Sequence, residues 1–188
     1  MTQCRSEVRY HYTVGKYVTE ILRVGIKPAT AFVPKSERPI VWFTSSEQWE
    51  GTANKGIVGH GVNRTLTRDE TERMCGGLYR IGVRDDMLGL HPFQRITNES
   101  RQHPAVTDSL VSIAIEAGSN PDRDWFGTFH TVDPVEFAAV ERWDGTNWQE
   151  TREERKAAGA MAGLAWRKRR WQVNTVGVKT TELTSPTQ

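Results

Sequence analysis

The chain has 188 residues, the length of one ordinary domain, and its 25 basic and 23 acidic residues leave a formal net charge of only +2. Hydrophobic residues make up 37% of the sequence, which supplies a core and excludes wholesale disorder. The longest apolar runs have four residues, as in 40–43, which excludes a membrane-spanning helix. Because the N-terminal residues also lack an apolar targeting segment, we expect a cytoplasmic protein that does not contact membranes.

The first predicted elements are a strand and a helix joined without a loop. β-forming residues alternate over 8–12 and lead into a helix at 14–24, with Thr13 as its expected N-cap and Gly25 as its stop. The helix is predicted from apolar residues that recur at i, i+3, i+4, i+7 and i+8. These residues are Val14, Tyr17, Val18, Ile21 and Leu22.

The middle of the chain is predicted to be rich in strands. Three prolines make 28–39 a loop, and the apolar run that follows predicts a buried strand at 40–44. Four glycines make 45–64 irregular, with a short helix near 50–55. Further strands are expected at 78–84, 110–116, 125–131 and 135–143.

The C-terminal part is predicted to end in a hairpin, a helix and a loose tail. Asp144-Gly145 is a typical turn into a short strand around Trp148, and alanine-rich residues favour a helix at 152–168. The order of elements indicates an α+β fold rather than alternating βαβ units. We expect one catalytic domain over 1–150, followed by a basic helix and tail over 151–188.

Three segments carry residues suited to chemistry. The first is Tyr10-His11-Tyr12-Thr13, at the end of the opening strand. The second runs from Ile40 to Ser46 and on through Trp49 to Thr52-Ala53-Asn54-Lys55. The third is Asp133 to Val140, where alternation puts Glu136 on an apolar face of a strand. A carboxylate on such a face costs free energy unless it is solvated, paired with a cation or used in the chemistry of a site.

Each of these residues also has a purely structural interpretation. His11 would equally suit the edge of a core, bonded to a backbone carbonyl. Glu136 would equally suit a strand end beside the Asp133-Pro134 turn.

The order of the three segments resembles the ADP-ribosyltransferase fold, in the H-Y-E branch that includes the poly(ADP-ribose) polymerases. His11-Tyr12-Thr13 is similar to the family's H-G-T motif, and Val41-Trp42-Phe43-Thr44 with Thr52-Ala53-Asn54 is similar to its I-Y-F-S and S-A-N-Y segments. Val135-Glu136-Phe137-Ala138-Ala139-Val140 is similar to the late strand that begins with the catalytic glutamate. The chain also resembles DNA-targeting ADP-ribosyltransferase toxins and RNA 2′-phosphotransferases. The likeness spans about residues 8–143 and implies a split β-sheet core.

The sequence departs from the family pattern at three positions. Tyr12 replaces the family glycine, and Lys55 stands where the family has a tyrosine that stacks on the nicotinamide. Pro134 occupies the position two residues before Glu136, so the pattern of arginine-modifying enzymes is absent. Trp42 or Trp49 would then supply the aromatic surface.

The resemblance implies that NAD is the co-substrate, that no metal is needed, and that ADP-ribose passes to a nucleic acid (DNA or RNA) or protein acceptor as nicotinamide leaves. Glu136 and His11 would be the catalytic residues, with Glu136 stabilising an oxocarbenium-like centre and His11 holding the adenosine-side ribose. The residues expected to bind NAD are His11, Tyr12, Thr13, Trp42, Phe43, Thr44, Ser45, Trp49, Thr52 and Asn54.

Metal binding is not expected from the sequence. The two cysteines, Cys4 and Cys75, are far apart, and the five histidines show no HxxxH or HExxH spacing. We therefore predict no structural zinc.

Two other functions remain open from the sequence. Trp166 and Trp171 bracket the basic run Arg167-Lys168-Arg169-Arg170, which suits a nucleic-acid backbone or, equally, a solvated helix end. A non-catalytic module that binds nucleic acid or protein is therefore one alternative. The other is a two-histidine phosphodiesterase acting on cyclic nucleotides; His11-Tyr12-Thr13 supplies one H-x-T motif, but His130 has its threonine directly adjacent.

Overall fold

A seven-stranded sheet forms the centre of the computed structural model, which describes residues 7–30, 33–59 and 62–151. The strand order is β6-β7-β2-β1-β5-β8-β9, and all the neighbouring pairs are antiparallel. The strands are β1 (Val8–Val14), β2 (Val41–Thr44), β5 (Leu78–Arg84), β6 (His91–Pro92), β7 (Trp125–Thr128), β8 (Phe137–Trp143) and β9 (Trp148–Glu150).

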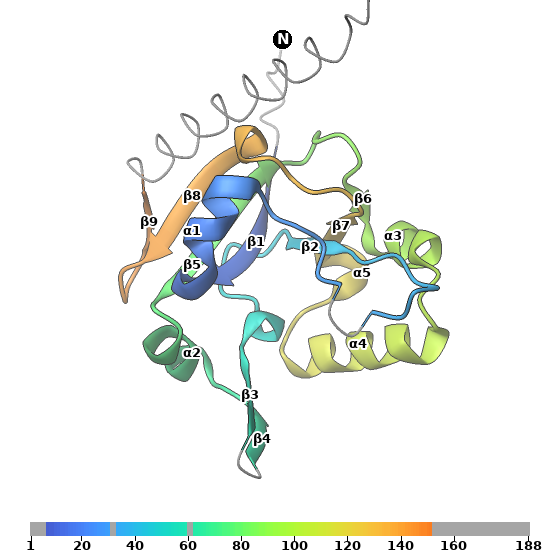
Figure 1. Cartoon of the computed structure of the whole chain (residues 1–188), viewed down its shortest axis with the longest axis horizontal. Coiled ribbons are helices and arrows are strands. Elements are labelled where there is room, and N and C mark those ends of the chain that lie inside the picture. The colour runs from blue at the N-terminus through green and yellow to red at the C-terminus, as the bar shows by residue number, and fades with distance from the viewer. Residues whose placement is uncertain (1–6, 31–32, 60–61, 152–188) are drawn as a thin grey trace, which may run out of the picture.

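The helices lie in two groups around this sheet (Figure 1). One helix, α1 (Gly15–Val24), crosses the strands β1, β5 and β8, whereas three others gather beside β6 and β7. Those three are α3 (Phe93–Ser100), α4 (Pro104–Glu116) and α5 (Pro121–Asp124). The remaining elements are α2 (Arg68–Met74), the 3₁₀ turns η1 (Gly51–Ala53) and η2 (Pro134–Glu136), and a separate hairpin of β3 (Gly56–Gly59) and β4 (Val62–Thr65).

This arrangement confirms the predicted α+β class, because the structure combines helices with an antiparallel sheet and contains no parallel βαβ units among the described residues. The helix expected at 14–24 is α1, and Gly25 ends it with a φ of 88° that favours glycine. The expected cap is one residue off, because Val14 occupies the N-cap position and Thr13 is buried in β1.

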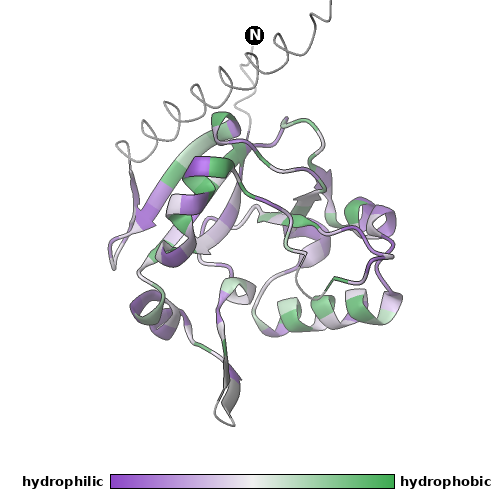
Figure 2. Ribbon diagram, in the orientation of Figure 1, coloured by the Kyte–Doolittle hydropathy of each residue, from purple (hydrophilic) through white to green (hydrophobic). Residues whose placement is uncertain are grey.

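The core has two parts, which take alternate residues of β2 and so lie on opposite faces of the sheet. The larger part includes the fully buried Ile81, Val83 and Val140, and α1 covers it with Ile21 and Leu22. The smaller part consists of Phe93, Ala114 and Trp125, against which Trp42 and Val111 pack. Figure 2 shows apolar residues along α4 as well, where Val106, Ile113 and Ile115 are exposed.

The two strands in the middle of the sheet barely pair. The β1–β5 ladder runs over the whole of β1, from Val8 opposite Arg84 to Val14 opposite Leu78. The β1–β2 pairing, in contrast, consists of Tyr10 opposite Thr44. The sheet is thus divided into a β1–β5–β8–β9 half and a β2–β7–β6 half that meet at one residue pair.

Several sequence predictions differ from the structure. The strand expected at 110–116 is the second half of α4, which begins with Pro104 in its first turn and with His103 Nδ1 accepting from the Ala105 N–H. In the segment 45–64 the short helix expected near 50–55 is found as η1, but the residues expected to be irregular also form most of the β3–β4 hairpin. The strand expected from 135 begins only at Phe137, because Pro134–Glu136 forms a turn.

The other expected elements are found close to their predicted bounds. The strands at 40–44, 78–84 and 125–131 correspond to β2, β5 and β7. Asp144 accepts the N–H groups of Thr146 and Asn147, and this turn leads into β9 as predicted. The helix expected at 152–168, and with it the C-terminal segment 151–188 apart from its first residue, lies outside the described residues. Within the described ranges, no helix combines the length and apolar character needed to cross a bilayer.

Replacement of the buried Ile81 tests where the larger part of the core lies. Its side chain is 0% exposed, so we expect Ile81→Ala to lower the free energy of unfolding by about 2–5 kcal/mol through lost packing and a residual cavity. Leu88→Ala is the matched control, because Leu88 is 93% exposed and its removal should change stability by less than about 0.5 kcal/mol. Urea denaturation followed by tryptophan fluorescence measures both. Equal midpoints for the two variants would contradict this placement of the core.

Candidate functional site

A cavity of about 310 Å³ lies where the two halves of the sheet meet. Its wall is formed by residues of β1, β2, η1 and β7, together with Leu110 of α4 and the polar residues Glu50 and Lys55 on either side of η1. Its size is at the lower end of the roughly 300–1,000 Å³ typical of small-molecule sites.

Aromatic side chains make up much of the wall. Trp42 of β2 and Trp125 of β7 both line the cavity, and their ring centroids are 5.7 Å apart. Tyr10, Tyr12 and Phe43 also line it. Such walls offer flat apolar surfaces for a planar ring and, through the negative faces of the π systems, for a cationic one.

His11 lies at the point where β1 and β2 separate. Its Nδ1 is 2.9 Å from the carbonyl oxygen of Trp42, and its ring packs edge-on against Phe43. A carbonyl only accepts, so Nδ1 carries the proton and Nε2 is left as an acceptor. Burial lowers the pKa of His11 to about 4, and the charge of Lys55 acts in the same direction. His11 is therefore a neutral hydrogen-bond acceptor at physiological pH.

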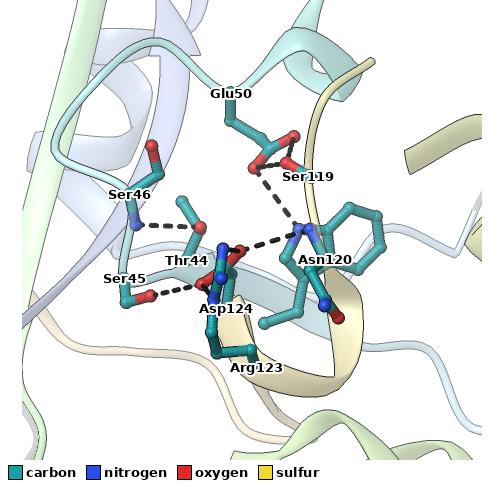
Figure 3. Close-up of polar contacts among 9 residues, drawn as sticks. Thr44, Ser45, Ser46, Glu50, Ser119, Asn120, Arg123 and Asp124 are labelled. Atoms are coloured by element: carbon teal, nitrogen blue, oxygen red, sulfur yellow. Dashed lines mark hydrogen bonds and ion pairs between the residues drawn. The ribbon is translucent and has the colours of Figure 1, made fainter. Parts of the chain in front are cut away.

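Glu50 is a buried carboxylate in the same wall, with only 6% of its surface exposed. Ser119 Oγ donates to it at 2.6 Å, Thr52 Oγ1 at 3.1 Å and Trp125 Nε1 at 3.3 Å. Figure 3 shows Ser119 pointing at the Glu50 carboxylate from a separate segment of the chain. These donors come from three segments, so the carboxylate is held in one position.

The loop that carries Glu50 is also fixed to the other half of the sheet. Arg80 of β5 is 8% exposed, forms a two-pronged ion pair with Glu141 and donates to the carbonyl of Glu47. Tyr12 donates its hydroxyl proton to the carbonyl of Ser46 at 2.8 Å. The segment 46–50 therefore spans the two halves.

Six of the ten residues predicted to bind NAD line the cavity: His11, Tyr12, Trp42, Phe43, Thr44 and Thr52. The other four are engaged elsewhere. Thr13 is buried in the sheet, and Ser45 donates to Asp124 Oδ1. Trp49 Nε1 donates to Asn54 Oδ1 at 2.9 Å, so these two side chains bind each other.

The structure does not bring Glu136 to this cavity. Glu136 is exposed at the end of η2, where its Oε2 accepts from the Asp133 N–H at 3.1 Å while Asp133 caps the same turn. This capping box turns the chain before β8 begins, so Glu136 does not project from a strand. The residue that places a carboxylate in the cavity wall is Glu50.

Sequence reasoning missed several residues of the wall. Tyr10 stands beside the first motif, and Lys55 ends the second, but neither was predicted to bind a ligand. Leu110 and Trp125 come from segments predicted to be strands of no particular function. Glu50 had a weak signal: it is the one acidic residue between Trp49 and Thr52 in the second motif.

Two further predictions concern other parts of the molecule. The basic run 167–170 lies outside the described residues. In the part of the chain that the structure describes, no group of three or more His, Cys, Asp or Glu side chains is placed to hold a metal ion.

Comparison with known proteins yields no relative. No family model, no curated protein and no solved structure matches the chain. The function is therefore argued from the cavity itself.

The lowered pKa of His11 predicts how stability depends on pH. The unfolded chain binds a proton at His11 near pH 6.5, whereas the folded protein does so only near pH 4. The free energy of unfolding should therefore fall as the pH drops from about 6.5 to about 4, by about 3 kcal/mol from this group.

His11→Asn is the control for this pH dependence, because its amide nitrogen retains a donor near the position of Nδ1 but does not titrate. Urea denaturation at a series of pH values should show that the variant lacks this part of the slope. NMR of the imidazole should show His11 neutral at pH 5. A His11 that titrates near 6.5 would contradict this account.

Proposed function

We propose that the chain is an NAD-dependent ADP-ribosyltransferase that transfers ADP-ribose from NAD to a nucleic-acid or protein acceptor and releases nicotinamide. The observation that carries the proposal is the pairing of a neutral His11 with a fixed Glu50 carboxylate in one aromatic cavity at the split of the sheet. The resemblance of the His11-Tyr12-Thr13 and Val41–Thr44 segments to the family motifs supports it, since both segments contribute to the cavity wall.

The charge in the cavity suits cleavage of a nicotinamide–ribose bond. As that bond breaks, its electron pair leaves with nicotinamide and the ribose carbon becomes oxocarbenium-like. Glu50 would stabilise this positive charge, because its carboxylate is held by donors and need not reorganise during the reaction. The acceptor then bonds to the ribose carbon and releases its proton to solvent.

The other wall residues suit the ground state of NAD. The oxidised nicotinamide ring is a planar cation, and the faces of Trp42 and Trp125 would attract it. His11 Nε2 would accept from a ribose hydroxyl, and the backbone of Tyr12 would hold the carboxamide. Thr44 and Thr52 add hydroxyl groups beside the ring.

The alternatives receive less support from the cavity. A two-histidine phosphodiesterase needs a second histidine facing the first, and His130 is not among the residues of this wall. A non-catalytic nucleic-acid module rests on 167–170, which the structure does not describe. Neither alternative explains why a carboxylate is buried and fixed beside an aromatic pocket.

The proposal is tested by NAD binding and by nicotinamide release. Calorimetry should detect NAD binding by the wild-type protein, and NAD labelled in the nicotinamide should release label when single-stranded DNA, RNA or a protein mixture is supplied. Glu50→Gln preserves shape but removes the charge. We expect NAD affinity within about three-fold of wild type and turnover lowered by about 10²–10³-fold, as for loss of one transition-state contact.

Glu116→Gln is the matched control, because Glu116 is an exposed glutamate at the end of α4. It should leave both measurements unchanged, and a thermal melt of each variant verifies folding. Absence of NAD binding by the wild type would overturn the proposal. If Glu136→Gln abolishes turnover while Glu50→Gln does not, the catalytic carboxylate is Glu136, as the sequence alone predicts.

A further inference from the structure

We propose that Lys55 is the anion-binding residue of the cavity and that it takes a phosphate group of the bound dinucleotide. The identity of the dinucleotide as NAD rests on the proposed function; the anion site itself does not.

The backbone places Lys55 firmly at the cavity wall. Its N–H donates to Thr71 Oγ1 at 3.3 Å, and its carbonyl accepts from the Leu66 N–H at 2.8 Å. Thr71 and Leu66 are 0% and 3% exposed, so both backbone polar groups of Lys55 are bonded to buried residues. Lys55 is one of the residues that line the cavity, two residues beyond η1.

Burial lowers the pKa of the Lys55 ammonium, and the group that acts in the opposite direction is the thiol of Cys75. Within the described ranges, no carboxylate lies within ion-pair distance of its Nζ. Glu50, the carboxylate of the same wall, is bonded instead by the side chains of Ser119, Thr52 and Trp125. The charge of Lys55 also contributes to the lowered pKa of His11, which lines the same cavity. A cation that is partly removed from water and has no carboxylate partner in the described ranges marks a place for an anionic ligand.

The chemistry of the other wall residues indicates which part of a ligand would lie against Lys55. The fixed carboxylate of Glu50 and the aromatic faces suit a cationic ring, whereas Lys55 repels one. A molecule with a cationic ring and a nearby phosphate complements both the carboxylate and the ammonium of the wall. An ammonium on a flexible stem binds phosphate as a point charge with three donors, which suits a diphosphate.

Calorimetry with three probes tests the role of Lys55. ADP-ribose carries the diphosphate without nicotinamide, nicotinamide riboside carries nicotinamide and ribose without phosphate, and NAD carries both. Lys55→Met keeps most of the stem and removes the charge. We expect this variant to lower the affinity for ADP-ribose and for NAD by ten-fold or more. Its affinity for nicotinamide riboside should stay within two-fold of the wild-type value.

Two variants serve as controls. Lys55→Arg retains the charge and should keep most of the ADP-ribose affinity, while Lys16→Met removes an exposed lysine of α1 and should change nothing. The wild-type affinity for ADP-ribose should also fall with rising salt, as expected for an ion pair. A thermal melt of Lys55→Met shows whether the variant is folded.

The outcomes separate this proposal from the proposed function. Equal ADP-ribose affinity in Lys55→Met and wild type would overturn the anion site. So would an equal loss of affinity for nicotinamide riboside in Lys55→Met, or no binding of ADP-ribose by the wild type. If Lys55-dependent ADP-ribose binding is seen but NAD is not bound and nicotinamide is never released, the transferase proposal fails and the anion site stands.

Discussion

The hydrogen bond from His11 Nδ1 to the carbonyl of Trp42 is the contact on which the opening of the sheet depends. Beyond the pair of Tyr10 and Thr44, β1 and β2 no longer form a ladder, so backbone groups of both strands lose their usual partners. The imidazole satisfies one of these carbonyls with a side chain and packs against Phe43. It thereby holds the strands apart at the site of the cavity.

The two halves of the sheet are rejoined by the loop that precedes η1. On one side Arg80 and Tyr12 bind the carbonyls of this loop; on the other, Ser119 and Trp125 bind the carboxylate of Glu50. Arg80 is itself held by its ion pair with Glu141, and its guanidinium lies 4.2 Å from the centre of the Tyr10 ring. A buried network in which each member has partners is rigid, so Glu50 has the fixed position that electrostatic stabilisation of a developing cation requires.

The local sequence pattern was sufficient to predict those elements that are determined by residues close together in the sequence. The apolar stripe of α1 and the apolar run that forms β2 each indicate one type of structure, because periodicity and flanking turn residues agree. The apolar residues at 110–116 do not indicate one type of structure, since a short apolar run fits a buried strand or a helix equally well. Pro104, six residues earlier, lies in the first turn of the helix that forms there.

The cavity carboxylate could not be predicted in this way. Glu136 has the expected neighbours in sequence, but its own capping box bends it away from β8. Glu50 becomes a buried acid through Ser119 and Trp125, which are 69 and 75 residues further along the chain. The arrangement of the two halves of the sheet brings such partners together, and this arrangement leaves no periodic signal in the sequence. The position of His11, in contrast, was predictable because it lies in a strand that the sequence pattern indicates clearly.

The charges of the cavity depend on one another. Burial and the nearby ammonium of Lys55 keep His11 neutral, and only a neutral imidazole with its Nδ1 proton given to Trp42 offers Nε2 as an acceptor. A phosphate bound by Lys55 would cancel part of the field at His11 and raise the pKa of its imidazole, while a cationic ring beside Glu50 would lower it again. A ligand with both charges would therefore change the pKa of His11 less than a ligand with the phosphate alone. For the phosphate alone, the raised pKa means by linkage that protonation of His11 would tighten binding.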